Sequence, residues 1–364
     1  MAMLPDAETF KRLVDGSARG LGPTAARLAL AAASLPYSLA VAARNLGYDA
    51  SLLPTGGVDV PVISIGNLTL GGTGKTPLVA WAARLLIDKG ISPAIVSRGY
   101  AARPGEQSDE GAELGILLPG VVHLENRDRV AGSRTAVAAG AGAIVLDDGF
   151  QHRRMRRDLD IVAVDATDPF GCGHLFPRGL LREPLRGLRR AHAVVLTRAS
   201  GIAPAGRVAI REVLAAACGG RPPDVWMEAE HRPIALRSSD GTTQPLSALR
   251  GRRIAAFAGI GNPAGFRGTL AALAADLVDV SLFPDHHPYD TADLDRLAAR
   301  MAAATAEVAV TTLKDLVKIR RTRLGDIPLV AVEIAMHPLA GGDDVARLVE
   351  AVAARAATPR SPTL

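Results

Sequence analysis

A glycine-rich segment behind a short apolar run constrains this chain more than any other part of its sequence. Val62–Ile65 is rich in β-branched residues, as a buried strand would be, and the chain then runs through Gly71-Gly72-Thr73-Gly74-Lys75-Thr76 to Pro77. Pro77 suits the first turn of a helix. A strand, a glycine-rich loop with Gly-Lys-Thr and a helix, in this order, form the phosphate-binding turn known as a P-loop.

Each part of such a loop has a defined chemical role. Glycines let backbone N–H groups converge on phosphate oxygens, and the helix N-terminus adds the positive end of its dipole. Lys75 would reach the β- and γ-phosphates of a nucleotide, and the hydroxyl of Thr76 would bind Mg²⁺. The strict pattern has glycine where Thr69 stands, so a plain glycine-rich turn is the alternative. The nucleotide-binding residues we expect are Gly71, Gly72, Thr73, Gly74, Lys75 and Thr76.

From Val60 onward the sequence alternates short apolar strands with helices, which predicts a doubly wound, mostly parallel α/β sheet. The ligand of such a sheet binds at the carboxyl ends of its strands. In the first half, strands are expected at Val62–Ile65, Ala94–Ser97, Val121–Leu124, Ala143–Asp147, Ile161–Asp165 and Ala193–Thr197, and helices at Leu78–Lys89, Arg129–Ala139 and Arg207–Ala217. In the second half, strands are expected at Arg253–Ala258, Leu277–Leu282, Val308–Thr312 and Leu329–Glu333, and helices at Ala264–Ala275, Thr291–Ala304 and Asp343–Ala356.

A Gly/Pro/Ala-rich stretch around 199–224 separates the two patterns and is typical of a hinge or linker. The length of 364 residues also suggests about two domains. The division we expect is an N-terminal region at 1–46, a P-loop domain at 47–224, a smaller second α/β domain at 225–356 and a disordered tail at 357–364.

Leu28–Ala42 is apolar and holds no charged residue. An apolar run of this length is too short to cross a bilayer comfortably. Arg19, Arg27 and Arg44 flank it, and Pro36 lies inside. One interpretation is a helix that lies in the membrane interface with its arginines on anionic head groups, and the other is an ordinary buried Ala-rich helix.

The charge and cysteine content narrow the class of ligand and the compartment. The formal net charge is +5, with the basic residues scattered and not interleaved with aromatic ones. This pattern favours anionic ligands or an anionic membrane surface over a nucleic-acid groove. Cys172 and Cys218 are too few for a disulfide framework or a zinc site, so a cytosolic, reducing compartment is expected.

Two acidic segments are candidates for phosphate chemistry. Ala143–His152 is an apolar strand that ends in Asp147 and Asp148, and in a P-loop protein an Asp at this place holds Mg²⁺ directly or through water. Gln151 and His152 follow, and they either orient phosphate or substrate or belong to a solvated loop. Ser97-Arg98-Gly99-Tyr100 ends another expected strand, and its loop runs on to Asp109, which could accept a hydroxyl proton or be a surface acid.

Three further segments combine residues that often line sites. Phe283–Tyr289, FPDHHPY, places an Asp beside two histidines, which suits an orienting or catalytic histidine as well as a capped turn. Phe170–Pro184 carries the Arg182-Glu183 pair and is either a site loop or a structural crossover. Thr311–Lys318 ends a strand with Lys314 and Asp315, and substrate binding and domain packing both stay open for it.

Taken together these segments resemble one family, the tetraacyldisaccharide 4′-kinases, which are the lipid A 4′-kinases of Gram-negative bacteria. Their order and spacing look like the family's from about residue 20 to 350. The residues that carry the resemblance are Gly66-Asn67, Gly74-Lys75-Thr76-Pro77, Ser97-Arg98-Gly99-Tyr100, Asp109-Glu110, Asp147 to His152, Arg157-Asp158, Leu181-Arg182-Glu183-Pro184, Gly259 to Pro263, Asp285-His286-His287 and Lys314-Asp315.

The resemblance implies a kinase that moves the γ-phosphoryl group of ATP, with Mg²⁺, to the 4′-hydroxyl of a tetraacyldisaccharide 1-phosphate, giving lipid IVA. It implies a peripheral or monotopic protein at the cytoplasmic face of the inner membrane, with Leu28–Ala42 as the anchor. Its partners would be the lipid substrate and the membrane surface, with no nucleic acid and no obligatory protein. A soluble P-loop ATPase or GTPase switch is the alternative function, and a membrane scaffold with a vestigial nucleotide site is a second.

By position, the resemblance also implies roles for single residues. Asp109 looks like the general base, paired with His286, and Lys75 joins them as a catalytic residue. The expected metal site is Thr76, Asp147 and Asp148. The positions expected near the phosphates or the lipid head group are Glu110, Arg129, Gln151, His152, Arg182 and Glu183. The chain departs from the family's usual residues at Gly111, Cys172, Arg178 and Leu313, which puts local loop geometry in question.

Overall fold

The computed structural model describes residues 7–99, 107–220, 223–273 and 275–356. Tyr100, Pro222 and the predicted tail at 357–364 lie outside the described residues. Within the described ranges the strands join into one 13-stranded sheet with the order β10-β9-β11-β13-β7-β6-β5-β1-β4-β2-β3, and β8 and β12 pair with β7 and β13. Neighbours are parallel except for the pairs β7–β13, β7–β8 and β12–β13.

The strands and helices have the following bounds. The strands are β1 Val62–Asn67, β2 Pro93–Ser97, β3 Val122–Glu125, β4 Ala143–Asp147, β5 Leu159–Asp165, β6 Ala193–Thr197, β7 Val225–Arg237, β8 Thr243–Gln244, β9 Arg253–Ala258, β10 Asp276–Leu282, β11 Val308–Thr312, β12 Arg323–Leu324 and β13 Ile327–Ala340. The helices are α1 Ala7–Val14, α2 Leu21–Asp49, α3 Lys75–Asp88, α4 Asp109–Leu117, α5 Arg129–Ala138, α6 Pro204–Ala217, α7 Pro263–Ala272, α8 Thr291–Ala303, α9 Leu313–Ile319 and α10 Gly342–Ala356.

The first half of the sheet, β6-β5-β1-β4-β2-β3, is entirely parallel, so the predicted doubly wound architecture is confirmed. β1 lies between β4 and β5, every residue of β1 is buried, and α3 packs on this strand and on β4. The chain order reverses on either side of β1, which makes its carboxyl end the switch point where such sheets bind ligands. The P-loop leaves the sheet at this point.

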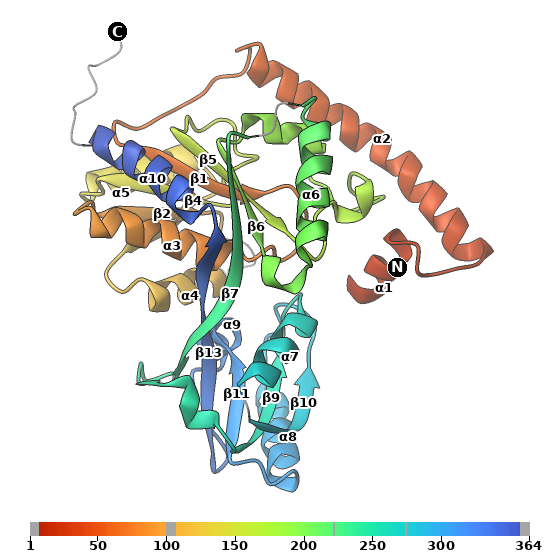
Figure 1. Cartoon of the computed structure of the whole chain (residues 1–364), viewed down its shortest axis with the longest axis vertical. Helices are drawn as coiled ribbons and strands as arrows, with labels where there is room; N and C mark the ends of the chain where they lie inside the picture. The colour runs from red at the N-terminus through yellow and green to blue at the C-terminus, as the bar shows by residue number, and fades with distance from the viewer. Residues whose placement is uncertain (1–6, 100–106, 221–222, 274, 357–364) are drawn as a thin grey trace.

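The second, smaller α/β unit that the sequence predicted is also present, with the parallel order β10-β9-β11-β13 and the helices α7, α8 and α9. Two long strands connect it to the first half: β7 pairs with β6 through Val225–Glu228, and β13 pairs with β11 through 329–332. β7 and β13 run antiparallel to each other between these ends and form a ribbon that spans the two bodies (Figure 1).

The structure corrects several expected elements. The structure has a strand, β7, at Val225–Arg237, where none was expected. It also has a 14-residue β13, of which only Leu329–Glu333 was expected. Asp109 was expected on a loop and instead begins α4, and α9 was not expected. α10 contacts α3 and β7 of the first half although it follows the second unit in sequence, and the division of the chain at residue 224 stays a prediction.

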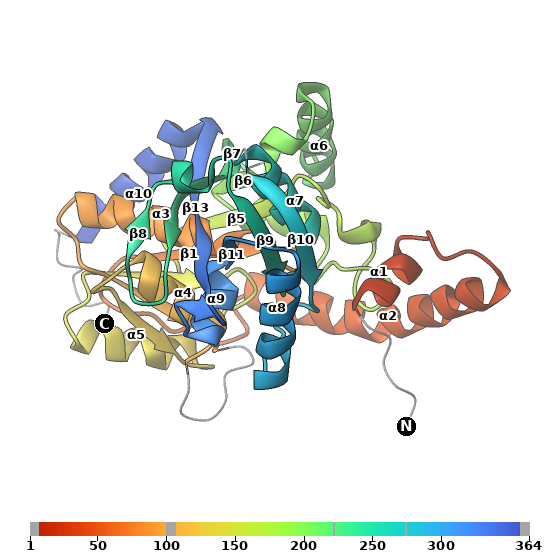
Figure 2. The ribbon, with the colours of Figure 1, turned by 90° about the horizontal axis from the view of Figure 1, so that it is seen from below.

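α2 is longer than the apolar run that predicted it, with 29 residues, and by length and composition it could cross a membrane. Only 6% of its most apolar window is buried, so the interpretation as an ordinary buried helix is wrong. It lies along the outside of the molecule together with α1 (Figures 1 and 2). At about 100° per residue, the exposed leucines of α2 fall within roughly 40° of one another and form a single stripe. This leucine stripe is Leu21, Leu28, Leu35, Leu39 and Leu46.

Candidate functional site

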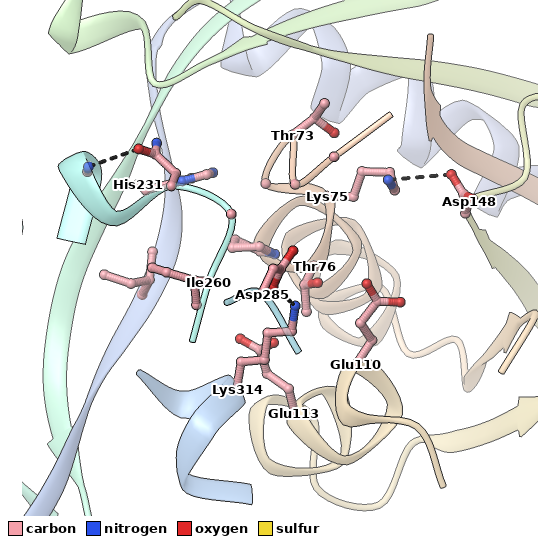
Figure 3. Close-up of a pocket in the computed structure, with 18 of the residues that line it drawn as sticks. Thr73, Lys75, Thr76, Glu110, Glu113, Asp148, His231, Ile260, Asp285 and Lys314 are labelled. Atoms are coloured by element: carbon pink, nitrogen blue, oxygen red, sulfur yellow. Dashed lines mark hydrogen bonds and ion pairs between the residues drawn. The ribbon is translucent and has the colours of Figure 1, made fainter. Parts of the chain in front are cut away.

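A cavity of about 1450 Å³ opens at the carboxyl ends of the first-half strands, between the two units. Its wall comes from the P-loop, from the ends of β2 and β4, and from α2 on one side, and from the segment before α7 and the start of α9 on the other. Figure 3 shows labelled side chains from both units around this space. The cavity lies where the parallel sheet predicts a ligand.

The P-loop has the backbone that its glycines allow. Gly74 has φ 75° in the left-handed region and caps α3, which begins at Lys75. The loop is fixed from the side by the end of β6, because the Thr197 hydroxyl donates to the Thr73 carbonyl at 2.8 Å and Arg198 donates to the Gly72 carbonyl at 3.0 Å. The loop and the start of α3 line the cavity, and a glycine-rich turn before a helix N-terminus suits an anion.

Lys75 is held between two groups at the strand ends. Its ammonium lies 3.2 Å from Oδ1 of Asn67, the last residue of β1, and 3.4 Å from Oδ1 of Asp148 (Figure 3). Arg182 donates to both oxygens of Asp148, at 2.8 and 2.7 Å. Burial alone would raise the pKa of Asp148, but the charges of Lys75 and Arg182 outweigh it and lower the pKa to about 2. Asp148 therefore stays ionised and orients the lysine.

Asp147, the last residue of β4, is buried and its Oδ1 has no hydrogen-bond partner among the described residues. Burial raises its pKa to about 7, and the nearby carboxylates of Glu110 and Asp148 add to the shift. A buried carboxylate oxygen without a donor suits a bound cation, which would restore the charged form. Asp147 and the hydroxyl of Thr76 both line the cavity, so these residues fit a Mg²⁺ ion.

His231 of β7 lies against the P-loop and was missed from the sequence. A Cβ placed on Gly74 would lie 2.0 Å from Cε1 and 2.3 Å from Nε2 of this ring. Burial, with the charge of Arg198 adding, lowers the pKa of His231 to about 4, so the ring is neutral at pH 7. β7, one of the two strands of the β7–β13 ribbon, thus contacts the phosphate-binding turn directly.

Replacing Gly74 by alanine should lower the free energy of unfolding by at least about 1–2 kcal/mol, because the left-handed backbone is unfavourable for a side chain and the ring of His231 must also move. Thermal or urea unfolding measures the change. Gly72→Ala is the matched control, because a Cβ placed on Gly72 would have no heavy atom within 4 Å and the φ of Gly72 is not positive. Equal stability of the two variants would contradict the expected role of Gly74.

The residues expected near the phosphates or the head group fall into two groups. Glu110, Arg129, Gln151, His152 and Arg182 all line the cavity. Burial, with the charge of Arg129 adding, lowers the pKa of His152 to about 4.

Glu183 does not line the cavity. It is fully buried and accepts hydrogen bonds from Arg190 at 2.8 Å, from Gln151 at 2.9 Å and from Asn45 of α2 at 3.3 Å. These hydrogen bonds indicate that Glu183 holds the side chains of Arg190, Gln151 and Asn45 in place.

α2 is bonded to this support through its inner face. Tyr37 donates to the backbone carbonyl of Arg182 at 2.8 Å, and Arg153 donates to the carbonyl of Asn45 at 3.0 Å and to Asp49 at 2.7 Å. The leucine stripe lies on the opposite face of the helix from Val41, its buried residue. One face of α2 is therefore fixed to the site and the other is left exposed and apolar.

Asp109 and His286 meet across the two units. Asp109 is the first residue of α4, and Ser108 caps this helix by accepting from the N–H of Gly111 at 3.1 Å. Nδ1 of His286 lies 3.2 Å from Oδ2 of Asp109, and Lys318 lies 3.9 Å from the same oxygen. α4 packs directly against α9, the helix that carries Lys318, which brings the two units into contact at this pair.

The surroundings of Asp109 favour its charged form. Burial alone would raise its pKa, but the hydrogen bond with His286 and the charges of Lys318 and Lys314 outweigh it and hold the pKa below its ordinary value of 3.8. His286 lines the cavity, whereas Asp109 is not among the described residues that line it and is connected to the cavity wall through His286. His286 also has a left-handed backbone, with φ 61°, in the turn after β10.

The comparisons with known proteins agree with one another. The family model for tetraacyldisaccharide-1-P 4′-kinase matches residues 26–353. A tetraacyldisaccharide 4′-kinase of Anaeromyxobacter dehalogenans (strain 2CP-C) is 44% identical over 307 residues, which are 79% of this chain and 80% of that protein. A second, of Anaeromyxobacter sp. (strain Fw109-5), is 42% identical over 339 residues, 88% of this chain and 90% of that protein.

The chain belongs to the tetraacyldisaccharide 4′-kinase family. A solved structure agrees: that of LpxK from Aquifex aeolicus in complex with ATP, which is 29% identical with a TM-score of 0.69 over 90% of this chain and 99% of that one. The family resemblance that the sequence motifs indicated is thereby confirmed.

Some residues of this tetraacyldisaccharide 4′-kinase site had no signal in the sequence. Thr197 ends an ordinary apolar strand and Arg198 follows it, and His231 lies in a segment without a clear period. Glu113 lines the cavity one turn after Asp109, and burial raises its pKa to about 7. The left-handed backbone of Cys172, at φ 60°, has no explanation in its contacts.

Proposed function

We propose that this chain transfers the γ-phosphoryl group of ATP to the 4′-hydroxyl of a tetraacyldisaccharide 1-phosphate and forms lipid IVA at the cytoplasmic face of the inner membrane. The observation that carries the proposal is that the P-loop and His286, the hydrogen-bonded partner of Asp109, line one cavity from opposite units. A phosphate donor on the first wall and a hydroxyl near the second would meet in this space.

The nucleotide would be held by this chain's own groups on the P-loop side. The N–H groups between Gly71 and Thr76 and the ammonium of Lys75 suit the β- and γ-phosphates. The hydroxyl of Thr76 and the carboxylate of Asp147 suit Mg²⁺, which when bound neutralises charge on the phosphates. Asp148 and Asn67 hold Lys75 in its place beside them.

Asp109 would accept the proton of the 4′-hydroxyl. The oxygen of that hydroxyl forms its bond to the γ-phosphorus while the bond from phosphorus to ADP breaks, and the proton goes to the carboxylate. His286 donates to Oδ2 of Asp109 and so fixes the orientation of the base. Because His286 and Asp109 belong to different units, opening the units would break the pair, and the arrangement in which the pair is formed would exclude water from the transfer.

The lipid acceptor would reach the site along α2. The leucine stripe faces outward over most of the length of the helix, while Tyr37 and Asn45 connect its inner face to Arg182 and Glu183. A helix with one apolar face and one bonded face suits the interface of a bilayer. This placement would present a head group to the cavity while its acyl chains stay in the membrane.

Replacing Leu28, Leu35 and Leu39 together by serine should weaken membrane binding by on the order of tenfold for each leucine, because each buries apolar surface in the bilayer interface. Co-sedimentation with vesicles of phosphatidylethanolamine and phosphatidylglycerol measures the binding. Leu339→Ser, at an exposed leucine near the end of β13, is the matched control. Unchanged sedimentation of the triple variant would contradict the anchoring role of α2.

The test of the function is the transfer of labelled γ-phosphate from ATP to a tetraacyldisaccharide 1-phosphate in mixed micelles or vesicles. We expect label in the lipid and little release of free phosphate without the acceptor. A soluble ATPase or GTPase switch would instead hydrolyse nucleotide at the same rate with and without lipid. Absence of any label in the lipid would overturn the proposed function.

A further inference from the structure

Lys314, near the start of α9, contacts the outer nitrogen of the histidine that is paired with Asp109. Its ammonium lies 3.1 Å from Nε2 of His286 and 2.9 Å from Oδ1 of Asp285. The Lys314 side chain is only 17% exposed, and Figure 3 shows its ammonium joined to Asp285. The imidazole of His286 thus lies between an ammonium group and a carboxylate.

An ammonium group has three donors and no acceptor. At 3.1 Å from Nζ, the Nε2 atom of His286 must therefore accept, which requires that it carry no proton. In a neutral ring the proton is then on Nδ1, and this N–H donates to Oδ2 of Asp109. A doubly protonated ring would instead place an N–H donor and a positive charge against the ammonium. The opposed donors and the like charges both disfavour that form of the ring.

We propose that Lys314 is a positioning residue that fixes His286 as the Nδ1–H tautomer and so keeps Asp109, not the histidine, as the group that takes the hydroxyl proton. The inference rests on the proposed function, because it gives that function's base pair a defined protonation state. It goes beyond that function in assigning a role to Lys314, for which the sequence left substrate binding and domain packing open.

The position of Lys314 is itself well fixed. Thr312 caps α9 and accepts from the N–H of Asp315 at 3.2 Å, while Oδ2 of Asp315 accepts from the N–H of Gly259 at 2.9 Å. Lys318, one turn later, bonds to Asp315 at 2.8 Å and faces Asp109. The start of α9 is thus tied to the sheet, and both lysines project from it toward the base pair.

The charge balance around the lysine also agrees with this role. Asp285 is bonded to its ammonium, and Glu113 lies near enough for the charge of Lys314 to lower that acid's pKa against the larger effect of burial. A charged lysine at Nε2 leaves His286 no free lone pair on that side, so the ring cannot compete with Asp109 for the proton.

The decisive experiment is histidine-selective ¹⁵N NMR of the full chain in the wild type and in Lys314→Met, which removes every donor. His286→Gln identifies the His286 signals among those of the 8 histidines. We expect unprotonated Nε2 and protonated Nδ1 in the wild type. In Lys314→Met the Asp109 carboxylate still holds the proton on Nδ1, and we expect Nε2 to take up a proton as well. Lys314→Arg keeps a charged donor and should restore the wild-type pattern.

Transfer kinetics give the second readout. Lys314→Met should lower kcat by roughly 10- to 100-fold and leave the KM for ATP within about twofold, because it changes the base pair and not the phosphate site. Lys89→Met is the matched control, at an exposed lysine paired with Glu350 away from the cavity, and should keep the wild-type rate.

Three results would overturn the role of Lys314. They are a protonated Nε2 in the wild type, an Nε2 that stays unprotonated in Lys314→Met, and a loss confined to the KM for ATP, which would make Lys314 a phosphate ligand. None of these depends on whether Asp109 is the base. Failure of the proposed function would appear elsewhere, as the absence of label in the lipid. Failure of the base assignment would appear as undiminished transfer in Asp109→Asn.

Discussion

Asp109→Asn should lower kcat for transfer to the lipid acceptor by on the order of 10²–10⁴ and leave the KM for ATP within about twofold. Asparagine keeps the size and the hydrogen bond with His286 but cannot take the proton of the 4′-hydroxyl. The site of Asp109, at the N-terminus of α4 and outside the P-loop wall, explains why ATP binding should survive. Steady-state kinetics with ATP and acceptor varied in turn measure both constants.

The pH profile gives the same prediction a second measurement. The pKa of Asp109 is held below its ordinary value of 3.8, so the free enzyme loses its base only when the pH falls through that lower pKa. The acidic limb of kcat/KM that belongs to Asp109 should therefore lie below the ordinary range for aspartate. His286→Ala removes the hydrogen bond that lowers the pKa, so this limb should move to higher pH.

Asp326→Asn, at an exposed aspartate between β12 and β13, is the control for the loss of one carboxylate. It should transfer phosphate at the wild-type rate. Near-normal turnover of both Asp109→Asn and His286→Ala would end the base-pair hypothesis. It would make Glu110 and Glu113, the two carboxyl groups of α4 on the cavity wall, the next to test.

Lys75→Ala should lower kcat/KM for ATP by on the order of 10²–10³, because it removes a positive charge from the wall that holds the β- and γ-phosphates. Asp148 would also lose one of the two cations that lower its pKa to about 2, so that pKa should rise. Nucleotide titration by calorimetry separates the loss of ATP affinity from the loss of turnover.

Lys89→Ala is the matched control for this substitution, since Lys89 follows the same helix and pairs with Glu350 at 3.0 Å. It should bind ATP as the wild type does. A wild-type affinity for ATP in Lys75→Ala would show that Gly71 to Thr76 do not form the nucleotide site, whatever the backbone of the loop suggests.

Local signals made the buried parallel strands of both halves predictable. β4, β6, β9 and β11 begin and end where the apolar runs do, because a strand buried on both faces reads as a continuous apolar segment. β7 has no such signal: its burial alternates irregularly, and it contains His231, Arg232 and Pro233. Its strand structure comes from its two neighbours, β6 and β13, and not from its own composition.

The site shows the same division between local and long-range information. The P-loop and the acids of β4 are each contiguous in sequence, so their chemistry could be inferred from spacing alone. Asp109 and His286 are 177 positions apart and meet only because α4 packs on α9. No periodicity reports such a contact, and only the likeness to a family pointed to the pair.

The buried Glu183 illustrates a different limit. Its motif, Leu-Arg-Glu-Pro, drew attention to both charged residues equally. In the fold Arg182 reaches Asp148 at the cavity, while Glu183 turns inward to Arg190, Gln151 and Asn45. Which of two neighbouring charges faces a ligand depends on the direction of the backbone, and the sequence does not specify that direction.

The antiparallel ribbon of β7 and β13 has a mechanical consequence. Its register runs from Ala331 opposite Arg237 to Ala340 opposite Glu228, so two extended segments tied by hydrogen bonds join the halves. Extended chain resists stretching, whereas a two-stranded ribbon twists readily. We therefore expect the approach of one half to the other to be close to a single torsion of this ribbon. The distance between one pair of spin labels, one on α3 and one on α8, should follow it through a whole catalytic cycle.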